Sequence, residues 1–235
     1  MPFPVVRLAR AELRFAPRPW PFAKERRAEI DAHFADLSRK NPHAFNGRVL
    51  MLHTFAIEDA VLHGAYFETD FASFIAWRDF GWPDMSVRNC FGQAALRAAD
   101  GAFVLGVMAA QTMNAGRIYF PSGTPDLKDV VGERVDLGAS VLRELTEETG
   151  LTAADVLLDP SWHAVLAGPR LAMLKPVRSP LSADELRARI LAHMAGEAHP
   201  ELAGVRIARG PADLDDMMPE FIKDYLLEMW KEKTM

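Results

Sequence analysis

Cysteine is almost absent from this chain of 235 residues, because Cys90 is the only one. A single cysteine excludes an internal disulfide and a cysteine metal cluster, and it is typical of a reducing compartment. Residues 1–7 also lack the continuous apolar core of a signal peptide, and no apolar run approaches the length that spans a membrane. We therefore expect a cytoplasmic protein with no membrane partner.

An excess of positive charge is absent as well. The chain has 27 basic and 32 acidic side chains, which give a formal net charge of −5. This balance offers no general attraction to nucleic acid, so polymeric nucleic acid is not expected as a partner. The hydrophobic content of 49% and the charged content of 25% are typical of a globular protein with a sizeable core.

Long linkers and internal repeats are missing too, which predicts one elaborated domain with an N-terminal extension. Residues 1–20 are interrupted by prolines and are expected to be extended, and an apolar stripe at helical spacing follows between residues 30 and 37. We assign residues 1–45 to an arm and helix packed on the domain, and residues 46–235 to the domain itself. Whether the arm mediates a homodimer is left open.

Strand and helix patterns alternate through the rest of the chain. Strands are expected at residues 48–53, 60–68, 87–96, 102–108, 117–120, 163–167, 170–177 and 205–208. Helices are expected at residues 70–77, 137–149, 182–194 and 221–230. This order predicts an α/β fold in which a mixed β-sheet lies between helices.

The helix expected at residues 137–149 carries the most informative residues. Asp136 is well placed as its N-cap, and Gly150 suits the left-handed position that ends a helix. A buried stripe recurs every four residues, at Leu137, Val141 and Leu145. The helix is therefore expected to pack one face on the core and to leave the other free.

Three carboxylates lie on one side of this helix. Glu144 lies beside both Glu147 and Glu148, and Arg143 lies one turn before Glu147, because residues three and four apart are neighbours on a helix. Three like charges repel one another at such distances, and a cation or a basic partner can offset the repulsion. Oxygen ligands alone suit Mg²⁺ or Mn²⁺. The other interpretation is a solvated acidic face on an ordinary amphipathic helix.

The stretch Arg143-Glu144-Leu145-Thr146-Glu147-Glu148-Thr149-Gly150-Leu151 resembles the second half of the Nudix box, the signature of hydrolases that cut nucleoside diphosphates linked to another group. Upstream, residues 119–123 are similar to the strand and turn that supply the glycine of the box. The usual glutamate is missing. Counting six positions on from Gly123 gives Asp129, counting eight back from Arg143 gives Val135, and the loop carries about six extra residues.

The resemblance implies roles for individual residues. Glu144, Glu147 and Glu148 would bind Mg²⁺, with Mn²⁺ as a substitute and Glu148 as the principal ligand. Arg143 would orient Glu147 by a charge-assisted hydrogen bond, and the backbone carbonyl of Ser122 would also reach the metal. The metal would screen a pyrophosphate, polarise its phosphorus and lower the pKa of an attacking water.

A proton acceptor for that water is expected among the same glutamates or in a later loop. Glu197 and Glu201 are both available in the loop before the last expected strand. We prefer Glu201 as the further catalytic acid, and the alternative is a plain surface loop.

The resemblance also implies a Nudix-type α/β/α sandwich and a pyrophosphohydrolase activity on a small nucleoside diphosphate derivative. The order of residues 46–49, 70–74 and 100–101 loosely resembles the branch that splits UDP-sugars, so a nucleotide sugar is one candidate substrate. The alternative function is a catalytically weak Nudix-fold protein that binds a nucleotide or acts as a regulator. The missing glutamate and the longer loop motivate that alternative.

Overall fold

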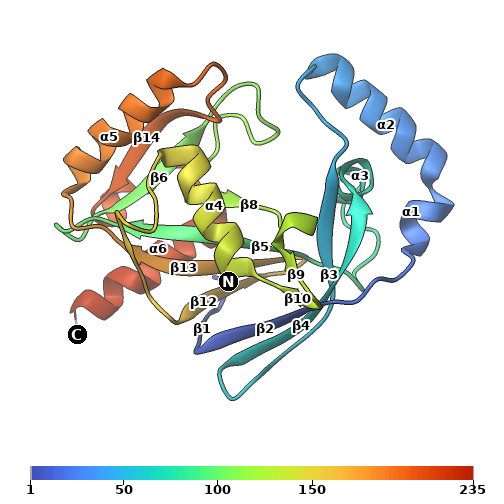
Figure 1. Cartoon of the computed structure of the whole chain (residues 1–235), viewed down its shortest axis with the longest axis horizontal. Coiled ribbons are helices and arrows are strands. Elements are labelled where there is room, and N and C mark those ends of the chain that lie inside the picture. Colours follow the sequence, from blue (N-terminus) through green and yellow to red (C-terminus); the bar gives the residue numbers. More distant parts are fainter. Residues whose placement is uncertain (1, 235) are drawn as a thin grey trace.

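Two β-sheets form the centre of the computed structural model, which describes residues 2–234 (Figure 1). The larger sheet has nine strands, with the order β1-β12-β13-β5-β6-β14 along its main path and three short strands at its sides. The smaller sheet has five strands in the order β3-β4-β2-β10-β9. Both sheets are mixed, because β13 runs parallel to β5 and β2 runs parallel to β4.

The strands of the larger sheet are β1 (Val5–Leu8), β5 (Asn89–Arg97), β6 (Phe103–Met108), β7 (Ile118–Tyr119), β8 (Ser122–Gly123), β11 (Leu157–Leu158), β12 (Trp162–Ala167), β13 (Arg170–Arg178) and β14 (Leu202–Ala208). The strands of the smaller sheet are β2 (Arg10–Phe15), β3 (Arg48–Glu58), β4 (Val61–Asp70), β9 (Val130–Val131) and β10 (Arg134–Val135). Short 3-10 turns are formed by η1 (Leu127–Asp129) and η2 (Pro211–Asp213).

Helices cover both faces of the larger sheet. The helices of the chain are α1 (Pro21–Glu25), α2 (Arg27–Lys40), α3 (Phe71–Asp79), α4 (Leu137–Thr149), α5 (Ala183–Gly196) and α6 (Glu220–Thr234). On β5, Gly92 faces Val141 of α4, whereas the ring of Phe91 packs against the ring of Phe221 of α6, with 5.9 Å between the two ring centroids. Because successive side chains of a strand point to opposite faces, α4 and α6 lie on opposite sides of the sheet.

The core is divided into two parts. The main cluster joins the larger sheet, its helices and the inner face of the smaller sheet. A second cluster lies between α1, α2, α3 and the smaller sheet, and its aromatic members include Trp20, Phe22, Phe67 and Trp77. The packing of α2 and α3 thus covers part of the outer face of the smaller sheet, around Met51 and Phe67.

The α/β fold with a mixed sheet between helices is confirmed. The smaller sheet as a separate layer was not predicted. Within residues 1–45, β1 pairs with β12 in the larger sheet and β2 pairs with β4 in the smaller one, while the division of the chain at residue 45 stays a prediction. Of the helices described for residues 2–234, none is both long enough and apolar enough to cross a membrane.

Candidate active site

Helix α4 begins and ends where its capping residues predict. The Asp136 side chain accepts a hydrogen bond from the backbone N–H of Ala139 at 3.0 Å, and Gly150 has a φ of 68°, in the left-handed region. The helix lies very close to β5, because a Cβ added at Gly92 would stand 2.4 Å from Cγ2 of Val141. Glycine at this strand position lets α4 approach the sheet, and α4 lies beside β8 (Figure 1).

Glu148 is the most deeply buried acid of the helix, with 3% of its surface exposed. Its Oε1 accepts a hydrogen bond from the backbone N–H of Ser122 at 3.1 Å. Its Oε2 is also buried, and it has no hydrogen-bond partner among the described residues. A buried carboxylate oxygen without a partner is costly, so Glu148 is held where a cation or a proton would stabilise it.

Glu144 lies next to the turn that contains Gly123. A Cβ added at Gly123 would stand 2.3 Å from the carboxylate carbon of Glu144, so only glycine leaves room for this carboxylate in its present position. Ser122 and Gly123 pair with β5, and they thereby fix the turn against the sheet. The residues that the sequence predicted for the site, Ser122, Glu144 and Glu148, are therefore neighbours.

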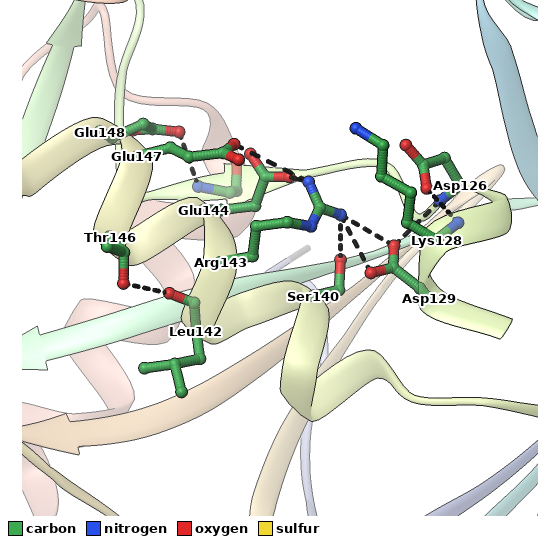
Figure 2. A network of polar contacts seen from close by, with 11 residues as sticks. Asp126, Lys128, Asp129, Ser140, Leu142, Arg143, Glu144, Thr146, Glu147 and Glu148 are labelled. Atoms are coloured by element: carbon green, nitrogen blue, oxygen red, sulfur yellow. Dashed lines mark hydrogen bonds and ion pairs between the residues drawn. The ribbon is translucent and has the colours of Figure 1, made fainter. Parts of the chain in front are cut away.

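Arg143 joins two acids from different segments (Figure 2). Its Nη2 donates to both carboxylate oxygens of Asp129 at 3.0 Å, and its Nη1 donates to Oε1 of Glu144 at 2.7 Å. Oε2 of Glu147 lies farther away, at 3.8 Å from Nη1, and the Glu147 side chain is 60% exposed. In this structure Arg143 therefore orients Glu144 more directly than Glu147, which the resemblance had suggested as its partner.

Asp129 is the acid of the preceding loop that contacts Arg143. It is 3% exposed, its carboxylate holds Arg143, and it also accepts a hydrogen bond from the backbone N–H of Asp126 at 3.0 Å. The other candidate, Val135, is buried in the main apolar cluster and has no carboxylate to offer. Of the two positions, Asp129 is therefore the one whose side chain contacts Arg143.

The extra residues of the loop form a small hairpin between Asp129 and α4. Strands β9 and β10 pair with each other, and β10 also pairs with β2 of the smaller sheet. The backbone N–H of Asp136 donates to the carbonyl of Asp129 at 2.7 Å and closes the base of the hairpin. The insertion therefore leaves Asp129 beside the helix that it supports, although the sequence spacing is longer.

Glu201 lies near these acids, just before β14. Desolvation by the surrounding protein atoms raises the pKa of its carboxyl, and the charges of Glu147 and Glu197 raise this pKa further. Its carbonyl accepts a hydrogen bond from Ala109, which fixes the backbone of the loop. Glu201 in turn contributes to the raised pKa of both Glu144 and Glu148, so the structure brings all four predicted glutamates into one electrostatic cluster.

The cluster holds its negative charge at an energetic cost. Burial raises the pKa of Glu144 to about 7, against an opposing effect of Arg143, and the charge of Glu147 adds to the rise. Burial likewise raises the pKa of Glu148 well above its ordinary value, and the hydrogen bond from Ser122 opposes this rise. Removal of acids from water without enough positive charge nearby produces such shifts, which are common at functional sites.

Two residues of the site were not anticipated. Tyr119 is buried, its hydroxyl accepts a hydrogen bond from Nδ2 of Asn114 at 3.1 Å, and burial together with the nearby glutamates raises its pKa. His193 of α5 lies 3.0 Å from the backbone carbonyl of Glu147 and contacts the end of α4 at Gly150. Neither residue has a sequence signal of its own, because each reaches the site through the packing of another element.

The acids fit a hard cation in their chemistry, but their side chains do not form a closed ligand set. Within residues 2–234, no group of three or more histidine, cysteine, aspartate or glutamate side chains is arranged so that it could hold a metal ion. Glu144 is bound to Arg143, whereas the free oxygen of Glu148 is available. Carboxylate oxygens are nevertheless the ligands that Mg²⁺ prefers.

The fold and the site define an α/β protein with a partly buried acidic cluster formed by one helix and the loop before β14. No protein-family model matches the chain, and no curated protein matches it. Similar solved structures include the Nudix hydrolase RenU from M. smegmatis, at 13% identity over 62% of this chain and 83% of that chain, with a TM-score of 0.38. The MutT protein from Methanosarcina mazei Go1 has 16% identity over 63% and 95%, with a TM-score of 0.37. A Nudix-family hydrolase from Clostridium perfringens has 15% identity over 62% and 94%, with a TM-score of 0.35.

Proposed function

We propose that the protein is a Nudix-type hydrolase that uses Mg²⁺ to cleave the pyrophosphate bond of a nucleoside diphosphate linked to another group. The observation that carries the proposal is the position of Glu148. Its Oε2 is buried without a partner beside the turn at Ser122, within a cluster of acids that share too little positive charge. The resemblance of residues 143–151 to the Nudix box supports the same chemistry.

The residues of the chain would divide the work between them. Glu144, Glu147, Glu148 and the carbonyl of Ser122 would hold the metal, which supplies charge neutralisation for the pyrophosphate and an acidified water. Asp129 fixes Arg143, and Arg143 fixes Glu144, so the arrangement of the ligands depends on a chain of charge-assisted hydrogen bonds. Glu201 is a candidate for the base that takes the proton, because it lies near the other acids and its raised pKa makes it a stronger proton acceptor than an ordinary glutamate.

The alternative, a catalytically weak protein that binds a nucleotide, has one observation on its side. The acids do not form a closed metal site in the described residues, and Glu144 is engaged by Arg143. The missing glutamate, which motivated this alternative, is a weaker argument for lost catalysis, because Asp129 provides an acid for Arg143. Turnover separates the two functions.

A test of the proposal measures hydrolysis over a panel of nucleoside diphosphate derivatives that includes UDP-sugars, with and without Mg²⁺. We expect metal-dependent release of a nucleoside monophosphate, and we expect Glu148→Gln to lower kcat/KM by about a hundredfold or more. Glu133→Gln is the matched control, because Glu133 is exposed in the turn of the inserted hairpin. Products made in heavy-oxygen water identify the attacked phosphorus.

Ligand-induced thermal stabilisation without any product across the panel would support the binding protein instead. Equal activity in Glu148→Gln and the parent protein would remove the acidic cluster from the mechanism.

A further inference from the structure

An open pocket lies on the outer face of the smaller sheet and shares no residue with the acidic cluster. Its volume is about 830 Å³, which is within the range of sites that bind small molecules. Its polar lining comes from three strands and the inserted hairpin: Arg10, Glu12, Arg14, Thr54, His63 and Arg134.

The alternation of β2 places the arginines on this face. Ala11 and Leu13 pack toward the main apolar cluster, so Arg10 and Arg14 point to the other side of the sheet. Helices α1 to α3 cover the same outer face only farther along, around Phe67. The part of the sheet that carries the arginines is therefore open to solvent.

The charges of the pocket are unbalanced. Arg14 and Arg134 are direct partners in the register of β2 and β10, and like charges opposite each other destabilise a strand pair. Neither side chain has a carboxylate partner among residues 2–234. The one carboxylate of the lining, Glu12, is already engaged by Arg10 at 2.7 Å and by His63 at 3.2 Å.

We propose that this pocket is a binding site for a small phosphorylated anion, with Arg14 and Arg134 as its two principal donors. Guanidinium groups match phosphate oxygens with paired N–H donors, and a bound anion would remove the repulsion between the two arginines. The pocket is larger than inorganic phosphate requires, so the chemical class is a diphosphate or a small phosphate ester. Arg10 and His63 border the same space and would contact the rest of the ligand.

Inorganic pyrophosphate is the probe, and its binding is measured by titration calorimetry at low salt in EDTA. EDTA keeps metal away from α4, where the bare acids of the cluster repel pyrophosphate, so this test does not depend on the proposed hydrolysis. We expect the parent protein to bind the probe and Arg14→Gln/Arg134→Gln to bind it at least about tenfold more weakly. Arg14→Lys keeps the charge but loses the paired donors, and we expect an intermediate affinity.

Lys40→Gln/Arg187→Gln is the matched control, because it also removes two positive charges at exposed positions, on α2 and α5. We expect this control to bind pyrophosphate as the parent protein does, and higher salt to weaken binding in both. The mutated arginines are exposed, so thermal unfolding should show that each variant remains folded. Absence of binding to the parent protein, or undiminished binding to Arg14→Gln/Arg134→Gln, would overturn the proposal.

Discussion

Replacement of Glu144 by glutamine should stabilise the metal-free protein at alkaline pH. Burial raises the pKa of this carboxyl from 4.5 to about 7, so the folded state holds the proton more tightly than the unfolded state does. The contribution of this carboxyl to the free energy of unfolding is therefore fully present below pH 4.5 and is lost as the pH rises through about 7. Glutamine is close in shape and never ionises, so the variant lacks this loss.

The size of the effect follows from the difference between the two pKa values. A difference from 4.5 to about 7 corresponds to about 3 kcal/mol once the carboxyl is fully ionised in both states. The side chain is 14% exposed, so screening by solvent reduces this figure only modestly. We expect the variant and the parent protein to differ little near pH 4, and the variant to be more stable by about 2–3 kcal/mol near pH 8.5.

Urea unfolding in EDTA at several pH values measures this difference directly. Glu133→Gln provides the control, because an exposed glutamate should give no pH-dependent difference of this size. Addition of Mg²⁺ should stabilise the parent protein more than Glu144→Gln, since a cation favours the ionised ligands. If the difference between variant and parent stayed constant with pH, or if the variant were the less stable protein near pH 8.5, the reasoning about the cluster would be refuted.

Three other substitutions test separate parts of the structure. Gly123→Ala should lower kcat/KM by about tenfold and change stability little, because the added Cβ of the alanine displaces the flexible end of the Glu144 side chain. An unchanged kcat/KM would contradict this. Asp129→Asn should lower the free energy of unfolding, measured by urea unfolding, by about 2 kcal/mol or more, because Arg143 loses a buried carboxylate partner. A change near zero would show that Asp129 does not stabilise Arg143. Burial lowers the pKa of His163, so the unfolded state binds its proton more tightly, and the stability of the parent protein should fall as the pH drops below 6.5. His163→Gln should lose less stability than the parent protein between pH 7 and pH 5. An equal loss in both proteins would show that His163 is not responsible.

Each of these substitutions has a control at an exposed position. Gly196→Ala adds the same methyl group where no heavy atom lies within 4 Å apart from the adjoining residues and the backbone of its own helix. Asp36→Asn removes an acid from an exposed ion pair with Arg39, which should contribute about 1 kcal/mol at most. His43→Gln replaces an exposed histidine and is the control for His163→Gln.

The parts of the site that depend on neighbouring residues could be predicted from the sequence. The ends of α4 follow from Asp136 and Gly150, because capping is decided within one helical turn. The grouping of Glu144, Glu147 and Glu148 follows from helical spacing alone. The positions of most strands along the chain likewise follow from the alternation of apolar and polar residues and from turn residues.

The parts that depend on distant pairing could not be predicted. Asp129 reaches Arg143 only because six extra residues fold into a hairpin that joins the smaller sheet. The parallel pairing of β2 with β4 connects segments that are far apart in the chain, and no local pattern specifies it. Helical spacing also did not indicate that Arg143 would form its hydrogen bond with Glu144 and lie farther from Glu147.

Binding of Mn²⁺ to the purified protein, followed by electron paramagnetic resonance, is the most direct test of the acidic cluster as a metal site. Mn²⁺ prefers the same oxygen ligands as Mg²⁺ and gives a signal that falls when the ion is bound. We predict saturable binding to the parent protein and to Glu133→Gln, and binding at least about tenfold weaker to Glu148→Gln. Failure of the parent protein to bind Mn²⁺, or equal binding by Glu148→Gln, would contradict the assignment of a metal to this helix.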